Sequence, residues 1–379
     1  MIVDLTDEQC RAAMPEKWGT CPADVTPAWV AEMDYAPAPV IAEALHAAVD
    51  RGQLGYPQFG GDPRLREAYA GFAARRYGQV VDPDAVMPVV DVTAGVRVAL
   101  DVLSEPGAMV MLLPAYTPQL EVAQVTGRDR VDLVVDPDAE RAELDLDQLD
   151  AHFMAGARTL LLTQPHNPWG RVFTRAELEG VRDVVLRHGA RVISDEIHAP
   201  LVLAGASHTS YLDLEGTSDH AVAVVAASKA FNTAGMRCAQ LVVPDASSRK
   251  RLAEAPMVVN DSWSPFGVIA AIAAYESGDA WLDALLVRLD DQRNLLTELL
   301  ATHLPEARMR RPEGTYLAWI DLRAYGYADP AAVALERGRI RLSAGHDFHP
   351  GLAGHIRLNF ATSPERLTHL VNRLAISLT

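Results

Sequence analysis

Lysine is scarce in this chain, which narrows the search for an amine that could act as a nucleophile or a base. Only Lys17, Lys229 and Lys250 occur among its 379 residues. Lys229 lies in AASKAFNTAGMR (226–237), directly after the apolar run AVAVVA. An amine at the end of a buried strand is poorly solvated, which lowers its pKa and favours the uncharged, reactive form. A lone lysine would also suit an exposed loop, but Ser228 and Arg237 flank this one, and both could bind a phosphate.

Asp195 supplies a charge that complements this amine. It ends the run RVIS and opens SDEIHAP (194–200), in which Glu196 is expected to be structural. Ligands of open parallel sheets bind at the carboxyl ends of strands, so Asp195 is expected to face a pocket, although a role in a turn stays open. Opposite a pyridine nitrogen, a carboxylate keeps the ring protonated and able to accept electrons from the Cα of an amino acid. Amine, carboxylate and phosphate ligands together predict pyridoxal 5′-phosphate (PLP), bound through Lys229.

Further polar or aromatic residues next to predicted strands could complete such a site, although each could equally be structural. Asn167 in TQPHNPWGR (163–171) could donate to a phenolic oxygen of the ring, and NPxG alone predicts a tight turn. Gly95 in VTAGVRVAL stands near a helix start, where free N–H groups favour a phosphate. Tyr116 in LPAYTP could stack on a flat cofactor, and Arg357 in HIRLNFA could clamp a carboxylate. His198 is expected either beside the ring or as hydrogen-bonding support.

The apolar pattern predicts an α/β fold that would position these groups. Between about residues 85 and 245, short apolar runs alternate with helical stretches such as 174–188, which indicates a mostly parallel sheet covered on both faces. The runs are AMVMLL (108–113), RVDLVV (130–135), TLLLT (159–163), RVISD (191–195), AVAVVA (221–226) and QLVVP (240–244). Residues 39–51 and 62–77 have helical periodicity, and 265–303 is expected to be helical throughout and to bridge two domains. TYLAWIDL (315–322) and HIRLNFA (355–361) predict strands of a smaller α+β domain.

Composition excludes several functional classes. The formal net charge of −16 would be repelled by nucleic acid and by an anionic membrane. No apolar run is long enough to span a bilayer, and the N-terminal residues lack the pattern of a secretion signal. The three cysteines, Cys10, Cys21 and Cys238, have no metal-ligand spacing, so we expect no metal site. Sparse cysteines in a chain of this size are typical of reduced thiols, which favours a cytoplasmic location.

Three motifs in this order, QPHNPWG, SDEIH and SKAFNTAGMR, resemble the aminotransferase class I/II superfamily of PLP enzymes. The resemblance implies PLP fold type I, with a mostly parallel seven-stranded sheet between helices and a smaller α+β domain. The chain is similar over nearly its whole length to the cystathionine β-lyase and cysteine C–S lyase subgroup. The segments that carry this likeness are WVAEMDY (29–35), GYPQFGG (55–61), PHNPWGRVFT (165–174), SDEIHAPLV (194–202), SKAFN (228–232), PEGTYLAWID (312–321) and IRLNFA (356–361). We expect an N-terminal arm with part of the small domain at 1–45, a large domain at 46–275 and a small domain at 276–379.

The resemblance also assigns a role to individual residues. It implies that Lys229 binds the PLP aldehyde, that Asp195 faces the pyridine nitrogen, and that Arg357 holds the substrate carboxylate. The other cofactor ligands that it implies are Asn167 at the 3′-oxygen, Tyr116 stacked on the ring, and Gly95, Val96, Ser228 and Arg237 at the phosphate. It further implies a homodimer in which Tyr56 reaches the phosphate of the neighbouring subunit, although a tyrosine packed in its own subunit would suit that loop as well.

Several positions depart from the subgroup pattern and bear on the substrate. Gln119 stands where an aromatic is usual, Arg97 where GVV is usual, Tyr35 where phenylalanine is usual, and RRYGQ (75–79) where RHGW is usual. We expect Gln119 and Tyr35 to contact the substrate and Arg97 to contact the cofactor.

The chemistry that follows is β-elimination from an S-substituted L-cysteine, with Lys229 removing the Cα proton and with thiol, pyruvate and ammonia as products. Transamination is an alternative. Decarboxylating oxidative deamination of a cysteine conjugate in specialised metabolism is another, since Gln119 and Arg97 suggest a polar substrate end. A PLP-fold protein that mainly binds a regulatory partner is a third possibility, and turnover of any amino acid would count against it.

Overall fold

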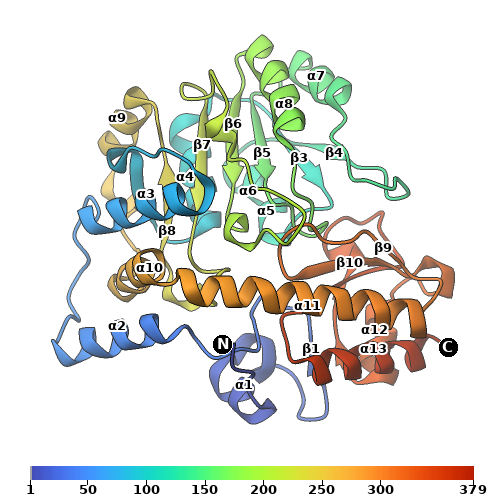
Figure 1. Ribbon diagram of the computed structural model, residues 1–379. Coiled ribbons are helices and arrows are strands. Elements are labelled where there is room, and N and C mark those ends of the chain that lie inside the picture. Colours follow the sequence, from blue (N-terminus) through green and yellow to red (C-terminus); the bar gives the residue numbers. More distant parts are fainter. Residues whose placement is uncertain (1) are drawn as a thin grey trace.

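A seven-stranded sheet forms the centre of the larger part of the molecule. The computed structural model describes residues 2–379, and Figure 1 shows this sheet with helices on both of its faces. Its strands are β2 (Val86–Val89), β3 (Met109–Leu113), β4 (Arg130–Val134), β5 (Thr159–Thr163), β6 (Arg191–Asp195), β7 (Ala221–Val225) and β8 (Ala239–Val242). The strand order is β2-β8-β7-β6-β5-β3-β4, and only β8 runs antiparallel to its neighbours. The predicted fold class, including the mostly parallel seven-stranded sheet, is confirmed.

Side-chain alternation explains how the sheet buries both faces. Neighbouring residues of one strand point to opposite sides. On β3, Val110 packs with Leu149 of α7 (Leu146–Met154) and Leu178 of α8 (Arg175–His188). The next residue, Met111, packs on the other face with Leu100 of α4 (Val92–Leu103). This two-sided burial is the reason that the strands are continuous apolar runs.

Six of the seven strands coincide with the apolar runs of the sequence, and β2 is the one that those runs do not include. Its sequence is VMPV, and Pro88 weakens the strand pattern because proline cannot donate to a ladder. The strand lies at the sheet edge, where it pairs with β8 alone. An edge position tolerates this proline. The strand therefore forms through its pairing with β8, which the local sequence pattern does not reveal.

A smaller antiparallel sheet lies beyond one end of the large one. Its strand order is β12-β13-β10-β9, with β9 at Arg308–Met309, β10 at Leu317–Asp321, β12 at Ser343–Ala344 and β13 at His355–Asn359. Helix α12 (Pro330–Gly338) packs against it, and α13 (Pro364–Leu378) packs against α12. The strands predicted at 315–322 and 355–361 are confirmed.

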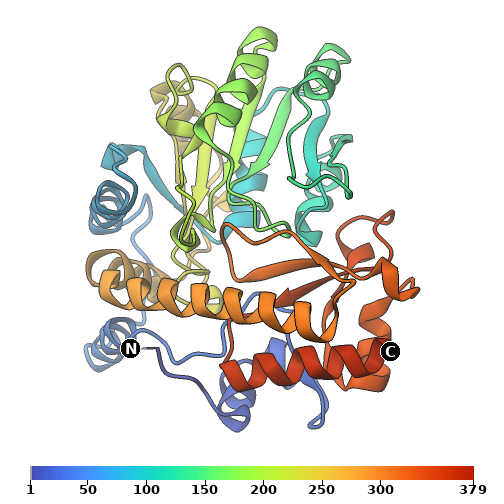
Figure 2. The same ribbon diagram turned by 45° about the vertical axis from the view of Figure 1, so that its right-hand side comes forward.

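The segment 265–303 consists of two helices, α10 (Pro265–Ser277) and α11 (Asp279–His303). They are separated at Gly278, where an added Cβ would lie 2.5 Å from the ring of Phe231, so the chain needs glycine for this close approach. Figures 1 and 2 show α11 crossing beside the end of the large sheet and lying along α13. The predicted domain boundary at 275–276 falls within the last turn of α10, and the division into domains stays a prediction.

The N-terminal part wraps around this framework. It contains α1 (Asp7–Ala13), β1 (Thr26–Pro27), α2 (Pro39–Asp50) and α3 (Pro63–Tyr77), and β1 pairs with β11 (Ile340–Arg341). The predicted start of α3 is confirmed, because the Asp62 side chain accepts from the Arg64 N–H and Pro63 is the first helical residue. Within residues 2–379, no helix is long and apolar enough to cross a membrane, and no cluster of ligands suited to a metal ion occurs.

Candidate active site

A cavity of about 360 Å³ opens where the large sheet presents the carboxyl ends of its parallel strands. The residues lining it come from the loops that follow β2, β3, β5, β6 and β7, together with Ala31 of the N-terminal segment. The sequence-predicted residues among them are Tyr116, Gln119, Asn167, Asp195, His198, Ser228, Lys229 and Arg237. The structure therefore brings together side chains from positions 116 to 237 that the sequence could only place at separate strand ends.

Lys229 presents its amine inside this cavity. Its Nζ donates to the carbonyl oxygen of Ala31 at 3.1 Å. Burial, together with the nearby Arg357 charge, lowers the pKa of this amine to about 8, while Glu32 and Asp195 oppose the shift. At pH 7 roughly one amine in ten is then uncharged, compared with fewer than one in a thousand for an ordinary lysine. Lys229 can thus act as a nucleophile or as a base.

Asp195 also lines the cavity, and two hydrogen bonds hold its carboxylate. Its Oδ1 accepts from the Ile197 N–H at 3.1 Å, and its Oδ2 accepts from Gln119 Nε2 at 2.5 Å. The side chain is 3% exposed, and this burial raises its pKa to about 6 despite both hydrogen bonds. The predicted substrate contact of Gln119 stays a prediction: the residue lines the cavity, but its amide is turned toward Asp195.

Glu196, the next residue, lies outside the cavity and is structural, as expected. Its carboxylate accepts from the Ser194 and Ser210 hydroxyls at 2.8 and 3.0 Å and from the Tyr211 N–H at 3.0 Å. Adjacent carboxylates of one strand end thus face different surroundings.

Asn167 lines the cavity and is hydrogen-bonded to Arg357, which is not itself among the lining residues. Arg357 Nη1 donates to Asn167 Oδ1 at 3.1 Å, and Nη2 donates to the Trp29 carbonyl at 2.7 Å. Its Nε is buried and has no hydrogen-bond partner within residues 2–379. The guanidinium lies over the ring of Phe348, and burial lowers its pKa to about 10, so it stays charged at neutral pH. An unsatisfied, charged donor next to Asn167 is suited to an anionic ligand group.

The other end of the cavity has the features of a phosphate subsite. It is lined by Asp91, Val92 and Thr93 at the N-terminus of α4, with Ser228 and Arg237 opposite. The first backbone N–H groups of a helix lack intrahelical partners and favour an anion. Arg237 also forms an ion pair with Asp91 at 2.9 Å.

The phosphate ligands predicted from the sequence, Gly95, Val96 and Arg97, lie further along α4 than this end of the cavity, and their role stays a prediction. Gly95 donates its N–H to the Asp91 carbonyl at 2.8 Å, so that N–H is not free. The glycine is needed for packing, because an added Cβ would lie 2.8 Å from Val224. Val96 is buried in the core, and Arg97 is half exposed with Asp101 at 4.0 Å. Asp91 is the helix cap, and its short acidic side chain before an apolar run was the signal that could have located the helix start.

His198 and three tyrosines were also predicted to belong to the site, and only some of them line the cavity. His198 lines the cavity, and burial lowers its pKa to about 3, so the imidazole is neutral. Tyr116 also lines the cavity. Tyr35 does not: it is buried, and its hydroxyl donates to the Thr362 carbonyl at 2.9 Å, which gives no support to a substrate contact. Tyr56 is 89% exposed on the loop between α2 and α3, outside the cavity.

The segment 29–35, which we call the strap, contributes backbone groups to the site. The sequence did not indicate this role of its backbone. Its Ala31 carbonyl accepts from Lys229 and, at 2.9 Å, from the Tyr316 hydroxyl. Asn232, three residues after Lys229, binds both the N–H and the carbonyl of Met33 at 2.9 Å. The strap is therefore bonded directly to the loop that carries the reactive amine.

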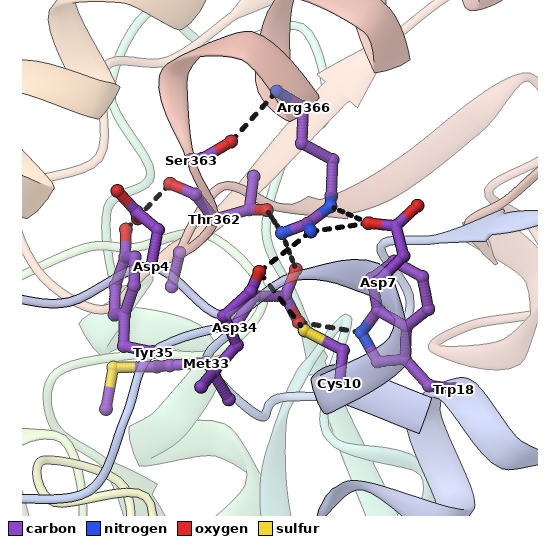
Figure 3. A network of polar contacts seen from close by, with 12 residues as sticks. Asp4, Asp7, Cys10, Trp18, Met33, Asp34, Tyr35, Thr362, Ser363 and Arg366 are labelled. Carbon is purple, nitrogen blue, oxygen red and sulfur yellow. Dashed lines mark hydrogen bonds and ion pairs between the residues drawn. The ribbon is translucent and has the colours of Figure 1, made fainter. Parts of the chain in front are cut away.

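Asp34 anchors this strap from behind. Its Oδ1 accepts from Lys17 Nζ at 2.7 Å and from Trp18 Nε1 at 2.8 Å, and its Oδ2 lies 3.5 Å from Arg366. Figure 3 shows Trp18 and Arg366 converging on this carboxylate. The side chains of Lys17 and Asp34 are each 1% exposed. Because water does not reach either charge, each depends on the other for its stabilisation.

Replacing Asp34 by alanine should lower the free energy of unfolding by about 3–5 kcal/mol, because Lys17 would be left buried without its partner. Urea unfolding measures this loss. The matched control is Asp24→Ala, which removes an exposed ion pair with Arg339 and should leave the unfolding curve nearly unchanged. Equal effects of the two substitutions would contradict the anchoring role.

Comparisons with known proteins agree with this geometry. Residues 30–374 match the family described as Aminotransferase class I and II. The chain is 35% identical over 363 residues to the cystathionine beta-lyase of Corynebacterium glutamicum, with 95% of each chain covered. It is 32% identical over 363 residues to the cystathionine beta-lyase PatB of Bacillus subtilis, covering 94% of this chain and 93% of that one. The solved structure of the PLP-bound C–S lyase from Staphylococcus hominis is similar with a TM-score of 0.88 at 26% identity, over 94% of both chains. This chain belongs to the aminotransferase class I and II family.

Proposed function

We propose that this protein is a PLP-dependent C–S β-lyase that cleaves an S-substituted L-cysteine. The observation that carries the proposal is one cavity lined by a reactive amine and a buried carboxylate, with an anion-binding helix end at its margin. Relatives named cystathionine beta-lyase and C–S lyase share this fold over nearly the whole chain. In the net reaction the conjugate and one water give a thiol, pyruvate and ammonium.

The residues of the cavity fit PLP. When bound, PLP supplies an aldehyde for a lysine amine and a protonated ring that accepts electrons. Lys229 offers the amine, and Asp195 would hold the proton on the pyridine nitrogen. Asn167 would direct its amide N–H₂ at the 3′-oxygen, because its Oδ1 accepts from Arg357 and the N–H₂ has no acceptor within residues 2–379. The remaining contacts would come from Tyr116 at the ring and from Val92, Thr93, Ser228 and Arg237 at the phosphate.

The reaction then depends on how these residues handle one proton and one carboxylate. Arg357 would bind the substrate carboxylate next to Asn167, with Nε as the one guanidinium nitrogen that has no partner within residues 2–379. This contact would aim the Cα–H bond at the uncharged amine of Lys229, which takes the proton as a general base. The C–S bond breaks with its electron pair leaving on sulfur as a thiolate. The neutral His198 carries no charge that would compete with these groups.

The products test the proposal. S-alkyl or S-aryl cysteines should give pyruvate and thiol in equal amounts without any keto-acid acceptor, because elimination needs only water as co-reactant. Pyruvate and thiol are measured by coupled dehydrogenase and thiol reagents, with carbon dioxide and oxygen followed in parallel. A strict need for an acceptor would identify transamination instead, and release of carbon dioxide with oxygen uptake would identify oxidative deamination. The structure gives no support to the polar substrate end suggested by Gln119 and Arg97, since both side chains have other partners.

We also propose a homodimer with shared active sites, in the cytoplasm. The loop after α2 exposes Leu54, Tyr56 and Phe59 by 67%, 89% and 53%, and Met257 and Val258 are exposed by 65% and 78%. So many exposed apolar side chains support contact with a second copy. Tyr56 would then reach the phosphate subsite of the partner.

Hybrid dimers of two inactive variants test whether each active site uses residues of both subunits. Lys229→Ala and Tyr56→Ala should each be poorly active alone. If Tyr56 serves the partner, a hybrid carries both defects in one site and neither in the other, so mixing with subunit exchange should restore activity. A tag on one variant verifies exchange. Verified exchange without recovery would contradict shared sites.

A further inference from the structure

Gln119 occupies an unusual position for a polar side chain. It lies in the short helix α5 (Thr117–Leu120) after β3 and is only 2% exposed. Its Nε2 donates to Asp195 Oδ2 at 2.5 Å, and its Oε1 accepts from the Thr163 hydroxyl at 3.5 Å. Three strand ends, those of β3, β5 and β6, thus meet at this one amide. A buried amide costs free energy unless it is hydrogen-bonded, so these two contacts set its orientation.

The hydrogen bonds of Asp195 show why this amide matters. Oδ1 is held by the backbone N–H of Ile197, a donor that every residue except proline would supply at that position. Within residues 2–379, Gln119 is the one side chain that donates to this carboxylate. The charged groups around Asp195 are Glu196, which disfavours its ionisation, and Lys229, which favours it. Gln119 is therefore the adjustable element in the hydrogen bonding of Asp195.

We infer that Gln119 is a positioning residue for Asp195: its amide keeps the carboxylate ionised and directed at the nitrogen of the bound pyridine ring. The inference rests on the proposed function in so far as it needs PLP with its ring nitrogen at Asp195. Oδ2 would otherwise rotate freely or take up a proton, and a protonated acid cannot form an ion pair with a pyridinium. Hydrogen bonding from Gln119 lowers the pKa of Asp195 and so opposes the effect of burial.

The test replaces Gln119 by methionine, which keeps the side-chain length and removes the donor. The dissociation constant of PLP is measured at equilibrium by absorbance, and the same is done with the 1-deaza analogue, whose ring carries CH in place of nitrogen. Gln119→Met should weaken PLP binding by about 10- to 100-fold, the range for one hydrogen bond to a charged group. It should change binding of the deaza analogue less than about threefold, because that ring has no proton for Asp195 to hold. If the methionine variant does not fold, Gln119→Leu carries the same test.

A matched control comes from a second buried glutamine. Gln164 is 0% exposed and lies next to Thr163. Its side-chain amide binds the backbone of Phe173 and does not contact the Asp195 carboxylate. Gln164→Met should leave the ratio of the two dissociation constants at its wild-type value. If Gln119→Met weakens both cofactors equally, or neither, the positioning role is overturned. The readout involves no substrate, so a failure of the proposed lyase activity would leave this result intact, whereas a wild type that binds no PLP would overturn both.

Discussion

Replacing Lys229 by alanine is expected to abolish measurable turnover, lowering kcat by about 10²–10⁴-fold or more, the range for loss of a general acid–base group. Neither other lysine can take its place. Lys17 is buried in its ion pair with Asp34. Lys250 is 75% exposed on α9 (Ala246–Glu254), with Glu254 at 3.8 Å. Only Lys229 has an amine in the cavity with a pKa near 8.

Reduction and peptide mapping test the same claim without any substrate. Borohydride should fix PLP to the protein, and mass spectrometry should find the label on the peptide that contains Lys229. Lys250→Ala is the control and should keep both the label and the activity. A label on Lys17 or Lys250, or a preparation that takes up no label, would contradict the assignment.

Much of this site could be predicted from the sequence because the fold brings the carboxyl ends of several strands together at one edge of the sheet. In parallel strands every carboxyl end lies on the same side, so residues that follow apolar runs must be neighbours in space. Asp195, Asn167 and Lys229 each follow such a run, and all three line the cavity. Helical sequence patterns predicted the helices at 62–77 and 174–188, which the structure shows as α3 and α8.

Other predicted roles stay untested, and for these residues the structure shows what the sequence left open: a pattern locates a residue but not the direction in which its polar groups point. Gln119 lies at the expected strand end, yet its amide turns to Asp195 instead of toward a substrate. Tyr35 lies in the right segment, yet its ring points into the core near Arg288. Gly95 lies on the right helix, but α4 starts at Val92, so its N–H is already used. Such directions depend on packing between segments far apart in sequence, which local patterns do not contain.

The second large effect is expected for Asp195→Asn. In the PLP-bound enzyme the substitution removes the charge that would hold the proton on the ring nitrogen. Loss of one partner of a buried charge pair costs about 2–5 kcal/mol, so PLP should bind roughly 30-fold or more weakly. Turnover should fall by about 10²–10³-fold, which is typical for loss of one electrostatic group in an active site. Near-normal activity with unchanged PLP affinity would show that Asp195 only shapes its loop.

The same substitution should have the opposite sign in the protein freed of PLP. Burial raises the pKa of Asp195 from 3.8 to about 6. A raised carboxyl pKa stabilises the fold at pH values below the unfolded pKa, and this contribution is lost as the pH rises through about 6. The loss amounts to about 3 kcal/mol, since each unit of pKa shift corresponds to about 1.4 kcal/mol. Asparagine has the same shape, can still accept from the Ile197 N–H, and carries no charge to desolvate.

Urea unfolding of the cofactor-free proteins at pH 4 and pH 7.5 therefore gives a double difference. Between these two pH values, wild type should lose about 2.4 kcal/mol relative to Asp195→Asn, slightly less than the full loss because pH 4 lies just above the unfolded pKa of 3.8. Titration of all other groups cancels in the comparison. Asp24→Asn, whose side chain is 65% exposed, is the control and should follow wild type at both pH values. A variant that runs parallel to wild type would mean that the Asp195 charge is well solvated without PLP. If the difference appears, the ionised Asp195 lowers the stability of the cofactor-free protein and raises the affinity for PLP. Such a trade-off is expected of a residue that is selected for its chemistry and not for stability.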